Sequence, residues 1–221
     1  GFTTKNVLTL RTALPLPKYK NVDPRVRFLD KLLTDVRALP GVTAASYVSW
    51  VPMGSMRGGI WPVIIGNRGV VRDASNSAML RFATPSFFST LNIPLLRGRD
   101  LAETDDATRP YVAVVSESFV RRYFPNEDPI GKRFTFALSE RTVIGVVADI
   151  RMRGLEQSSE PQVYTSYRQV QDGELAFYMP KDLIVRTTGS TASLLPQIRR
   201  IVREADSRQP ISNVATMEEV V

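Results

Sequence analysis

One order of strand, amphipathic helix and strand occurs at each end of the chain, and it limits the possible folds more than any other feature. Apolar and polar residues alternate from Val7 to Leu14, which predicts a strand that ends before Pro15. Residues 23–41 place apolar side chains three and four positions apart, and this spacing predicts an amphipathic helix. Residues 42–52 then predict a second strand.

The same order recurs at the other end of the chain. Residues 182–187 predict a strand, residues 191–205 predict a helix with Thr191 as a candidate cap, and a short strand follows around Ile211–Val214. In the first unit Asp23 is the expected cap, because its carboxylate can accept hydrogen bonds from the first turn. Two such units predict a split β-α-β, ferredoxin-like sandwich of the α+β class, with both helices on one face of an antiparallel sheet. The first and last strands then lie on adjacent elements, so both ends of the chain can leave from one side.

The segment between these units is expected to be an insertion with strands and helices of its own. Residues 77–83 predict a strand, and Thr84 is expected to cap a short helix whose apolar side chains, Phe87, Phe88 and Leu91, point inward. A buried strand at Val112–Val115 leads into a helix that Ser116 caps. Further strands are predicted at residues 131–136, 141–151 and 161–169, and a hairpin turn is predicted at residues 66–69. The boundaries place the sandwich at residues 1–55 and 178–221 and the mixed α/β insertion at residues 56–177.

Histidine and cysteine are both absent from the sequence. Without cysteine the chain has no thiol catalysis, disulfide bond or thiolate metal site, and without histidine it lacks the usual general base near neutral pH. The formal net charge is +7, but the basic residues are scattered, which disfavours a nucleic-acid groove. No apolar run reaches the roughly 18 residues of a membrane span. We therefore predict no catalytic, cofactor or metal site and no nucleic-acid partner.

Two motifs with basic residues are interpreted as structural. The Gly-Lys pair in "DPIGKRF" lacks the first glycine and the Ser or Thr of a phosphate-binding loop, so Lys132 and Arg133 are expected to be solvated in a turn. The stretch "RGRD", residues 97–100, is expected to form a tight turn with a local ion pair.

The acidic motifs are interpreted in the same way. Glu103, Asp105 and Asp106 are expected to form a solvated loop, because their spacing lacks the alternating oxygen ligands of a calcium loop. Asp149 ends a buried strand, a position where catalytic carboxylates occur, but the sequence spacing identifies no acid or base to pair with it.

Several segments, taken in order, resemble a known family. They are "TPSFFSTLNIPLLRGRDL", "VVSESFVRRYFPNEDPIGKRF", "TVIGVVADIRMRGL", "PQVYTSY", "VRTTG" and "TMEEVV". This ordered set is similar to the MacB-like periplasmic core domain of FtsX-type ABC transporter permeases, in the duplicated "predicted permease" branch. The resemblance covers nearly the whole chain.

The resemblance implies a porter-like subdomain at residues 1–55 and 178–221 and an inserted sabre-like subdomain at residues 56–177. It implies a position outside the cytoplasmic membrane, with transmembrane helices of the same permease before Gly1 and after Val221. It also implies an indirect partner, the cytoplasmic ABC ATPase, whose motion the domain relays to a periplasmic adaptor, a second permease domain or a substrate. The chain ends, which have no initial Met and no polar tail, are expected for a segment of a longer protein.

A solute-sensing or lipid-binding module is the alternative within the same architecture. It predicts a pocket between the two subdomains, lined by aromatic residues such as Trp61, Tyr164 or Tyr167. Trp50 and Trp61 bracket a stretch rich in Gly and Met, and at least one of them is expected to pack in the core. An enzyme is the third hypothesis, and its site would rest on Asp, Glu, Lys or Ser alone.

Overall fold

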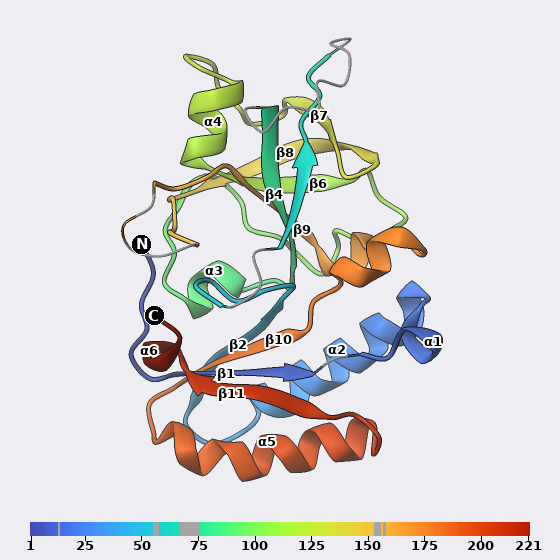
Figure 1. Cartoon of the computed structure of the whole chain (residues 1–221), viewed down its shortest axis with the longest axis vertical. Helices are drawn as coiled ribbons and strands as arrows, with labels where there is room; N and C mark the ends of the chain where they lie inside the picture. Colours follow the sequence, from blue (N-terminus) through green and yellow to red (C-terminus); the bar gives the residue numbers. More distant parts are fainter. Residues whose placement is uncertain (13, 55–57, 67–75, 153–155, 157) are drawn as a thin grey trace.

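A single mixed β-sheet extends through the molecule (Figure 1). The computed structural model describes residues 1–12, 14–54, 58–66, 76–152, 156 and 158–221. Within these residues the sheet has eleven strands, which come from both ends of the chain and from the predicted insertion. The α+β fold class is therefore confirmed.

The two ends of the chain supply four neighbouring strands, β1 (Val7–Thr12), β2 (Val42–Val48), β10 (Asp182–Thr187) and β11 (Ile211–Thr216). Their order is β11-β1-β10-β2, and all three pairings are antiparallel. This order is that of a split β-α-β sandwich, as predicted. Because β1 and β11 are neighbours, the N- and C-termini lie on the same side of the molecule in Figure 1.

Two long helices pack against these four strands, α2 (Val22–Arg37) and α5 (Thr191–Ala205). The apolar spacing predicts both, and both bury that stripe: Leu32 and Val36 of α2 and Ile198 and Val202 of α5 have almost no exposed surface. The prediction of two amphipathic helices on one sheet is confirmed.

The caps of these helices differ from the prediction. Asn21 and Ser190 hold the N-cap positions, so neither Asp23 nor Thr191 is a cap. A one-turn helix, α1 (Leu16–Tyr19), ends close before Asn21, and α2 begins where the extended backbone of Asn21 gives way to helix. Asp23 lies in the first turn instead, where a carboxylate still favours the positive end of the helix dipole.

The predicted insertion supplies seven described strands: β3 (Gly59–Pro62), β4 (Ser77–Ala83), β5 (Leu95–Gly98), β6 (Val112–Ser116), β7 (Arg133–Phe136), β8 (Ser139–Val147) and β9 (Gln162–Ser166). They continue the sheet in the order β4-β9-β6-β8-β5, with β3 on β4 and β7 on β8. One residue pair, Val48 with Ala83, joins β2 to β4. Of the hairpin turn predicted at residues 66–69, residues 67–69 lie outside the described residues.

Short helices complete the fold: α3 (Phe87–Thr90), α4 (Glu117–Tyr123), α6 (Met217–Val220) and the 3₁₀ turns η2 (Tyr167–Gln169) and η3 (Glu174–Tyr178). Ser116 caps α4 as predicted, because its hydroxyl accepts a hydrogen bond from the Phe119 N–H. Thr84 does not cap α3. Ser86 holds that position, and the Thr84 hydroxyl accepts a hydrogen bond of 2.8 Å from the Tyr47 N–H instead.

Successive side chains of a strand point to opposite faces of the sheet, and this divides the core into two clusters. Leu8 and Leu10 of β1 point to the face that α2 and α5 cover, which we call the helical face. Val7 of β1 and Ile184 of β10 point to the other side, which we call the opposite face, where α3 and α6 pack. Both clusters contain residues of the terminal strands and of the predicted insertion. The subdomain boundaries at 55/56 and 177/178 stay a prediction.

Candidate functional site

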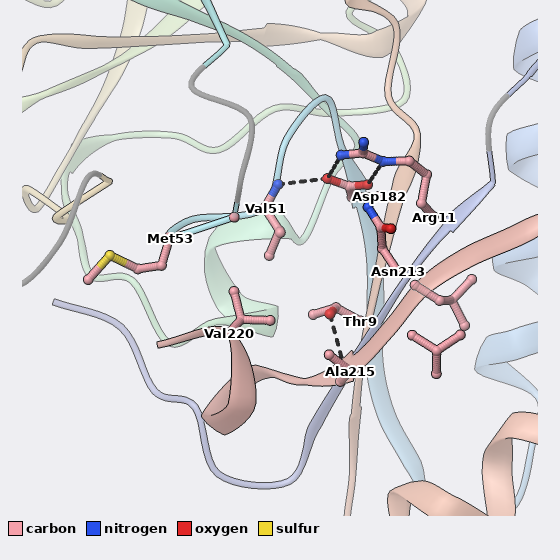
Figure 2. A pocket seen from close by; sticks show the side chains of 11 residues that line it. Thr9, Arg11, Val51, Met53, Asp182, Asn213, Ala215 and Val220 are labelled. Carbon is pink, nitrogen blue, oxygen red and sulfur yellow. Dashed lines mark hydrogen bonds and ion pairs between the residues drawn. The ribbon is translucent and has the colours of Figure 1, made fainter.

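A pocket of about 290 Å³ opens on the opposite face of the terminal strands. Figure 2 shows it between β1, β11, the loop after β2 and the C-terminal helix α6. Its lining residues are Thr9, Leu10, Arg11, Val51, Met53, Gly54, Asp182, Asn213, Val214, Ala215 and Val220, and we call this the sheet pocket. All of them fall within the segments predicted as porter-like.

An ion pair closes one end of the sheet pocket. Arg11 and Asp182 are directly opposed on β1 and β10, and the guanidinium donates two hydrogen bonds to the carboxylate, at 2.6 and 2.9 Å. The Val51 N–H donates a third hydrogen bond to the same carboxylate, at 2.9 Å. The hydrogen bond with Asp182 raises the pKa of Arg11 above its ordinary value. The two charges therefore neutralise each other.

A β-bulge shapes the wall of the pocket beside Asn213. Thr9 pairs with Ala215 and Arg11 with Ser212, so two residues of β11, Asn213 and Val214, lie opposite Leu10 alone. Asn213 has a φ of +49°, a left-handed conformation that asparagine tolerates better than most residues. In Figure 2 its amide lies beside the carboxylate of Asp182.

The other walls of the pocket are mostly apolar. Val51, Met53 and Val220 surround its mouth, and Figure 2 shows Met53 and Val220 on the side away from the ion pair, with Val51 next to Asp182. The Thr9 hydroxyl donates a hydrogen bond to the Ala215 carbonyl, at 3.1 Å, and leaves its own oxygen as an acceptor. The pocket thus has one polar end and one aliphatic end, a combination typical of sites for small ligands.

The lining offers no arrangement suited to general acid–base or nucleophilic chemistry. Asp182 is hydrogen-bonded to Arg11 and to a backbone N–H, and the described lining residues include no further acid or base. Within the described part of the chain, no cluster of three acidic side chains is arranged to hold a metal ion.

The aromatic residues predicted to line a pocket between the subdomains do not converge. Tyr164 is buried in the cluster of the opposite face and Tyr167 in that of the helical face. Trp61 packs against Tyr178, with ring centres 5.9 Å apart. None of the three lines the sheet pocket, and an aromatic-lined pocket between the subdomains stays a prediction.

Trp50 packs in the core, which confirms the expectation for at least one of the two, and Trp61 is partly buried against the cluster of the helical face. Trp50 is 1% exposed and meets Tyr178 edge-on at 5.6 Å. The Lys181 ammonium lies 4.7 Å from the centre of the Trp50 ring and 4.6 Å from that of Phe177. Burial in this aromatic environment lowers the pKa of Lys181 to about 8.

The "RGRD" stretch is not a tight turn. Residues 95–98 form β5, which pairs with β8 through a bulge, and Arg99 bonds to the carboxylate of Asp105 rather than to that of Asp100, at 2.8 Å on both oxygens. Gly98 has a φ of +70°, and a Cβ there would lie 2.1 Å from the Ile144 carbonyl oxygen. Pairing with a distant strand, which no local pattern encodes, decides the conformation.

The acidic loop is only partly solvated, contrary to the prediction. Asp105 is 5% exposed because its carboxylate receives hydrogen bonds from Arg99 and from the Ala102 N–H. Glu103 accepts hydrogen bonds from the Tyr167 hydroxyl and from Arg168. These carboxylates fasten the loop to the domain.

Asp149 stabilises the start of α4. Its carboxylate accepts hydrogen bonds from the Ser118 N–H, at 2.9 Å, and from Arg121, at 2.6 Å. Although burial opposes it, this bonding lowers the pKa of Asp149. Lys132 forms an exposed ion pair with Glu127 at 2.6 Å in the turn before β7, so the solvated turn is confirmed.

Sequence reasoning missed the sheet pocket. Arg11 and Asp182 each lie in a predicted strand, but only the register of β1 with β10 brings them together. The bulge at Asn213 has no local signal except the asparagine itself.

No helix in the described ranges combines the length and the apolar character that crossing a membrane requires. Solved structures share the fold. The periplasmic region of MacB from Actinobacillus actinomycetemcomitans superposes with a TM-score of 0.67 over 99% of this chain and 92% of that chain, at 16% identity. The extracellular domain of the ABC-type transporter YknZ from Gram-positive bacteria gives a TM-score of 0.62 over 95% of this chain and all of that chain, at 12% identity.

This architecture is that of the extracytoplasmic domains of ABC transporter permeases. The chain belongs to the family of MacB-like periplasmic core domains, whose model matches residues 9–201.

Two macrolide export ATP-binding/permease proteins MacB are similar in sequence. The protein from Aggregatibacter actinomycetemcomitans is 30% identical over 149 residues, and the one from Mannheimia succiniciproducens is 31% identical over 125 residues. These alignments cover 67% and 57% of this chain but only 21% and 18% of the relatives. The chain thus matches about a fifth of each relative's length.

Proposed function

We propose that the chain is a non-catalytic, extracytoplasmic domain of an ABC transporter permease, held by transmembrane helices on both sides. It relays the conformational change that a cytoplasmic ABC ATPase drives to a partner or substrate. The partner is a periplasmic adaptor or a second permease domain. Family membership supports the extracytoplasmic location in a permease. The relay of motion is argued from the fold.

The observation that carries the proposal is the adjacency of β1 and β11. The first and last strands pair along the edge of one sheet, so the two ends of the chain enter the domain side by side. A relative movement of two flanking helices would act on neighbouring strands. The sheet and both clusters continue from these strands into the insertion, which favours transmission of a displacement without a loose joint.

The test uses the full permease with its ATPase in lipid nanodiscs. The chain contains no cysteine, so Leu138→Cys and Arg199→Cys, both at exposed sites, accept spin labels without background from this domain. Each single variant reports distances to other labelled copies, and the double variant reports the distance within one copy. We expect ATP to change the distances between copies and to leave the distance within a copy unchanged. Identical distances with and without ATP would contradict the relay.

A solute-binding module is the second candidate, and the sheet pocket favours it. A pocket with one polar and one aliphatic end has the general character of a small-ligand site. Saturable thermal stabilisation by a small molecule or lipopeptide, abolished by Val220→Trp at the mouth, supports this candidate. Absence of stabilisation across a broad panel counts against it.

A further inference from the structure

We propose that the sheet pocket binds a neutral aliphatic segment of peptide, and that Asn213 determines this specificity. The proposal deepens the solute-binding candidate and does not depend on the relay. It rests on the charge balance of the lining, on the amide of Asn213 and on the size of the cavity.

The charge balance selects a neutral occupant. Among the described residues of the lining, Arg11 and Asp182 carry the charges, and each is the other's partner. A ligand with a full charge would lose its hydration without gaining a free counter-charge, which costs binding energy. A neutral polar group loses much less hydration free energy when it enters the pocket.

The Asn213 amide is a polar group of the lining that remains available, beside the acceptor oxygen of Thr9. It forms no hydrogen bond within the described structure, and it offers both donors and an acceptor at the wall of the pocket. A peptide group presents one N–H and one C=O, which matches a carboxamide in complementary fashion. The bulge in β11 holds Asn213 at this place, and Figure 2 shows its amide near the polar end.

The aliphatic end of the sheet pocket determines which side chain of the ligand it can accommodate. Val51, Met53 and Val220 form a mouth that suits a branched aliphatic group, and methionine adapts to different shapes. A volume of about 290 Å³ is at the lower end of the range for ligand sites, enough for one or two small residues. A blocked dipeptide therefore fits better than a long chain or a large ring.

The test is an NMR titration of the ¹⁵N-labelled 221-residue chain with N-acetyl-valyl-valinamide. We expect shifts centred on Thr9, Asn213 and Ala215, with a dissociation constant of about 1 mM for so small a ligand. The anionic analogue N-acetyl-valyl-valine should bind about tenfold more weakly, because its charge finds no partner. Shifts centred elsewhere, or no shift at the solubility limit of the peptide, overturn the proposal.

Asn213→Gly separates the role of the amide from that of the backbone. Glycine accepts the φ of +49° without strain, so the variant keeps the fold and loses only the carboxamide. We expect binding at least about fivefold weaker, the loss of one to two hydrogen bonds. Asn126→Gly, at a φ of +62° outside the sheet pocket, is the matched control and should bind as the parent does. Equal affinity of Asn213→Gly and the parent overturns the assignment of Asn213.

Discussion

The two faces of the sheet are covered in different ways. On the helical face, α2 and α5 have 16 and 15 residues and bury continuous apolar stripes. On the opposite face, α3 and α6 have four residues each, and the rings of Phe87 and Phe88 pack around Tyr164. A helix of one turn has almost no stability of its own. The opposite face therefore depends on single anchoring side chains, and it is there that the sheet pocket stays open.

The largest effect is expected from Phe87→Ala on the opposite face. Phe87 is fully buried and contacts both Phe88 and Tyr164, so its truncation should lower the free energy of unfolding by about 3–5 kcal/mol. Hydrogen exchange should show local loss of protection over residues 84–93, because a helix of one turn depends on its buried side chains for stability. Chemical denaturation gives the magnitude, and a loss below about 1 kcal/mol would refute the anchoring role.

Leu32→Ala is the corresponding change on the helical face. Leu32 is fully buried in α2, and its truncation should cost about 2–4 kcal/mol. The long helix keeps its other contacts, so exchange protection should fall globally rather than at α2 alone. Local release of α2 in this variant would remove the distinction between the two faces.

Asp206→Asn tests how the end of α5 is fixed on the helical face. The carboxylate accepts hydrogen bonds from the Lys18 ammonium and the Tyr19 hydroxyl, both at 2.7 Å, and these lower the pKa of Asp206 to about 2. At neutral pH the variant should lose about 1–2 kcal/mol. Because the folded pKa lies below the unfolded one, this stabilisation is complete above about pH 4 and disappears toward pH 2. Denaturation of both proteins from pH 2 to 8 measures it, and a constant difference would contradict the linkage.

Thr216→Ala should have the smallest effect, on the opposite face. Thr216 and Glu219 form a capping box at α6, with the Glu219 carboxylate bonded to the Thr216 N–H at 2.7 Å. Loss of the cap should cost about 0.5–1 kcal/mol, measured by chemical denaturation, and loosen Val220 at the pocket mouth. Thr216→Ser is the control that keeps the hydroxyl. A loss of stability as large as that of Leu32→Ala would show that α6 contributes more to the stability of the opposite face than a single helical turn is expected to.

The same contrast explains how far the sequence predicts the structure. The stripes of α2 and α5 repeat over about four turns, so their spacing predicts both helices and the sandwich. Caps at Asn21 and Ser190 depend on where the preceding chain turns, and no periodic signal marks that residue. The ion pair of Arg99 with Asp105 and that of Arg11 with Asp182 depend on tertiary register, which a single sequence does not supply.

The position of β1 in the sheet has a consequence for the order of folding. β1 is the first strand to be synthesised, yet its two partners in the sheet, β10 and β11, are the last. The strands of the insertion pair chiefly among themselves, so they can assemble before β10 and β11 are available to pair with β1. Pairing β1 with β10 closes a loop of most of the chain, and the entropic cost of this closure precedes the stabilising contacts. We therefore expect the edge that receives both chain ends to be the last part of the sheet to form, and its closure to limit the rate of folding.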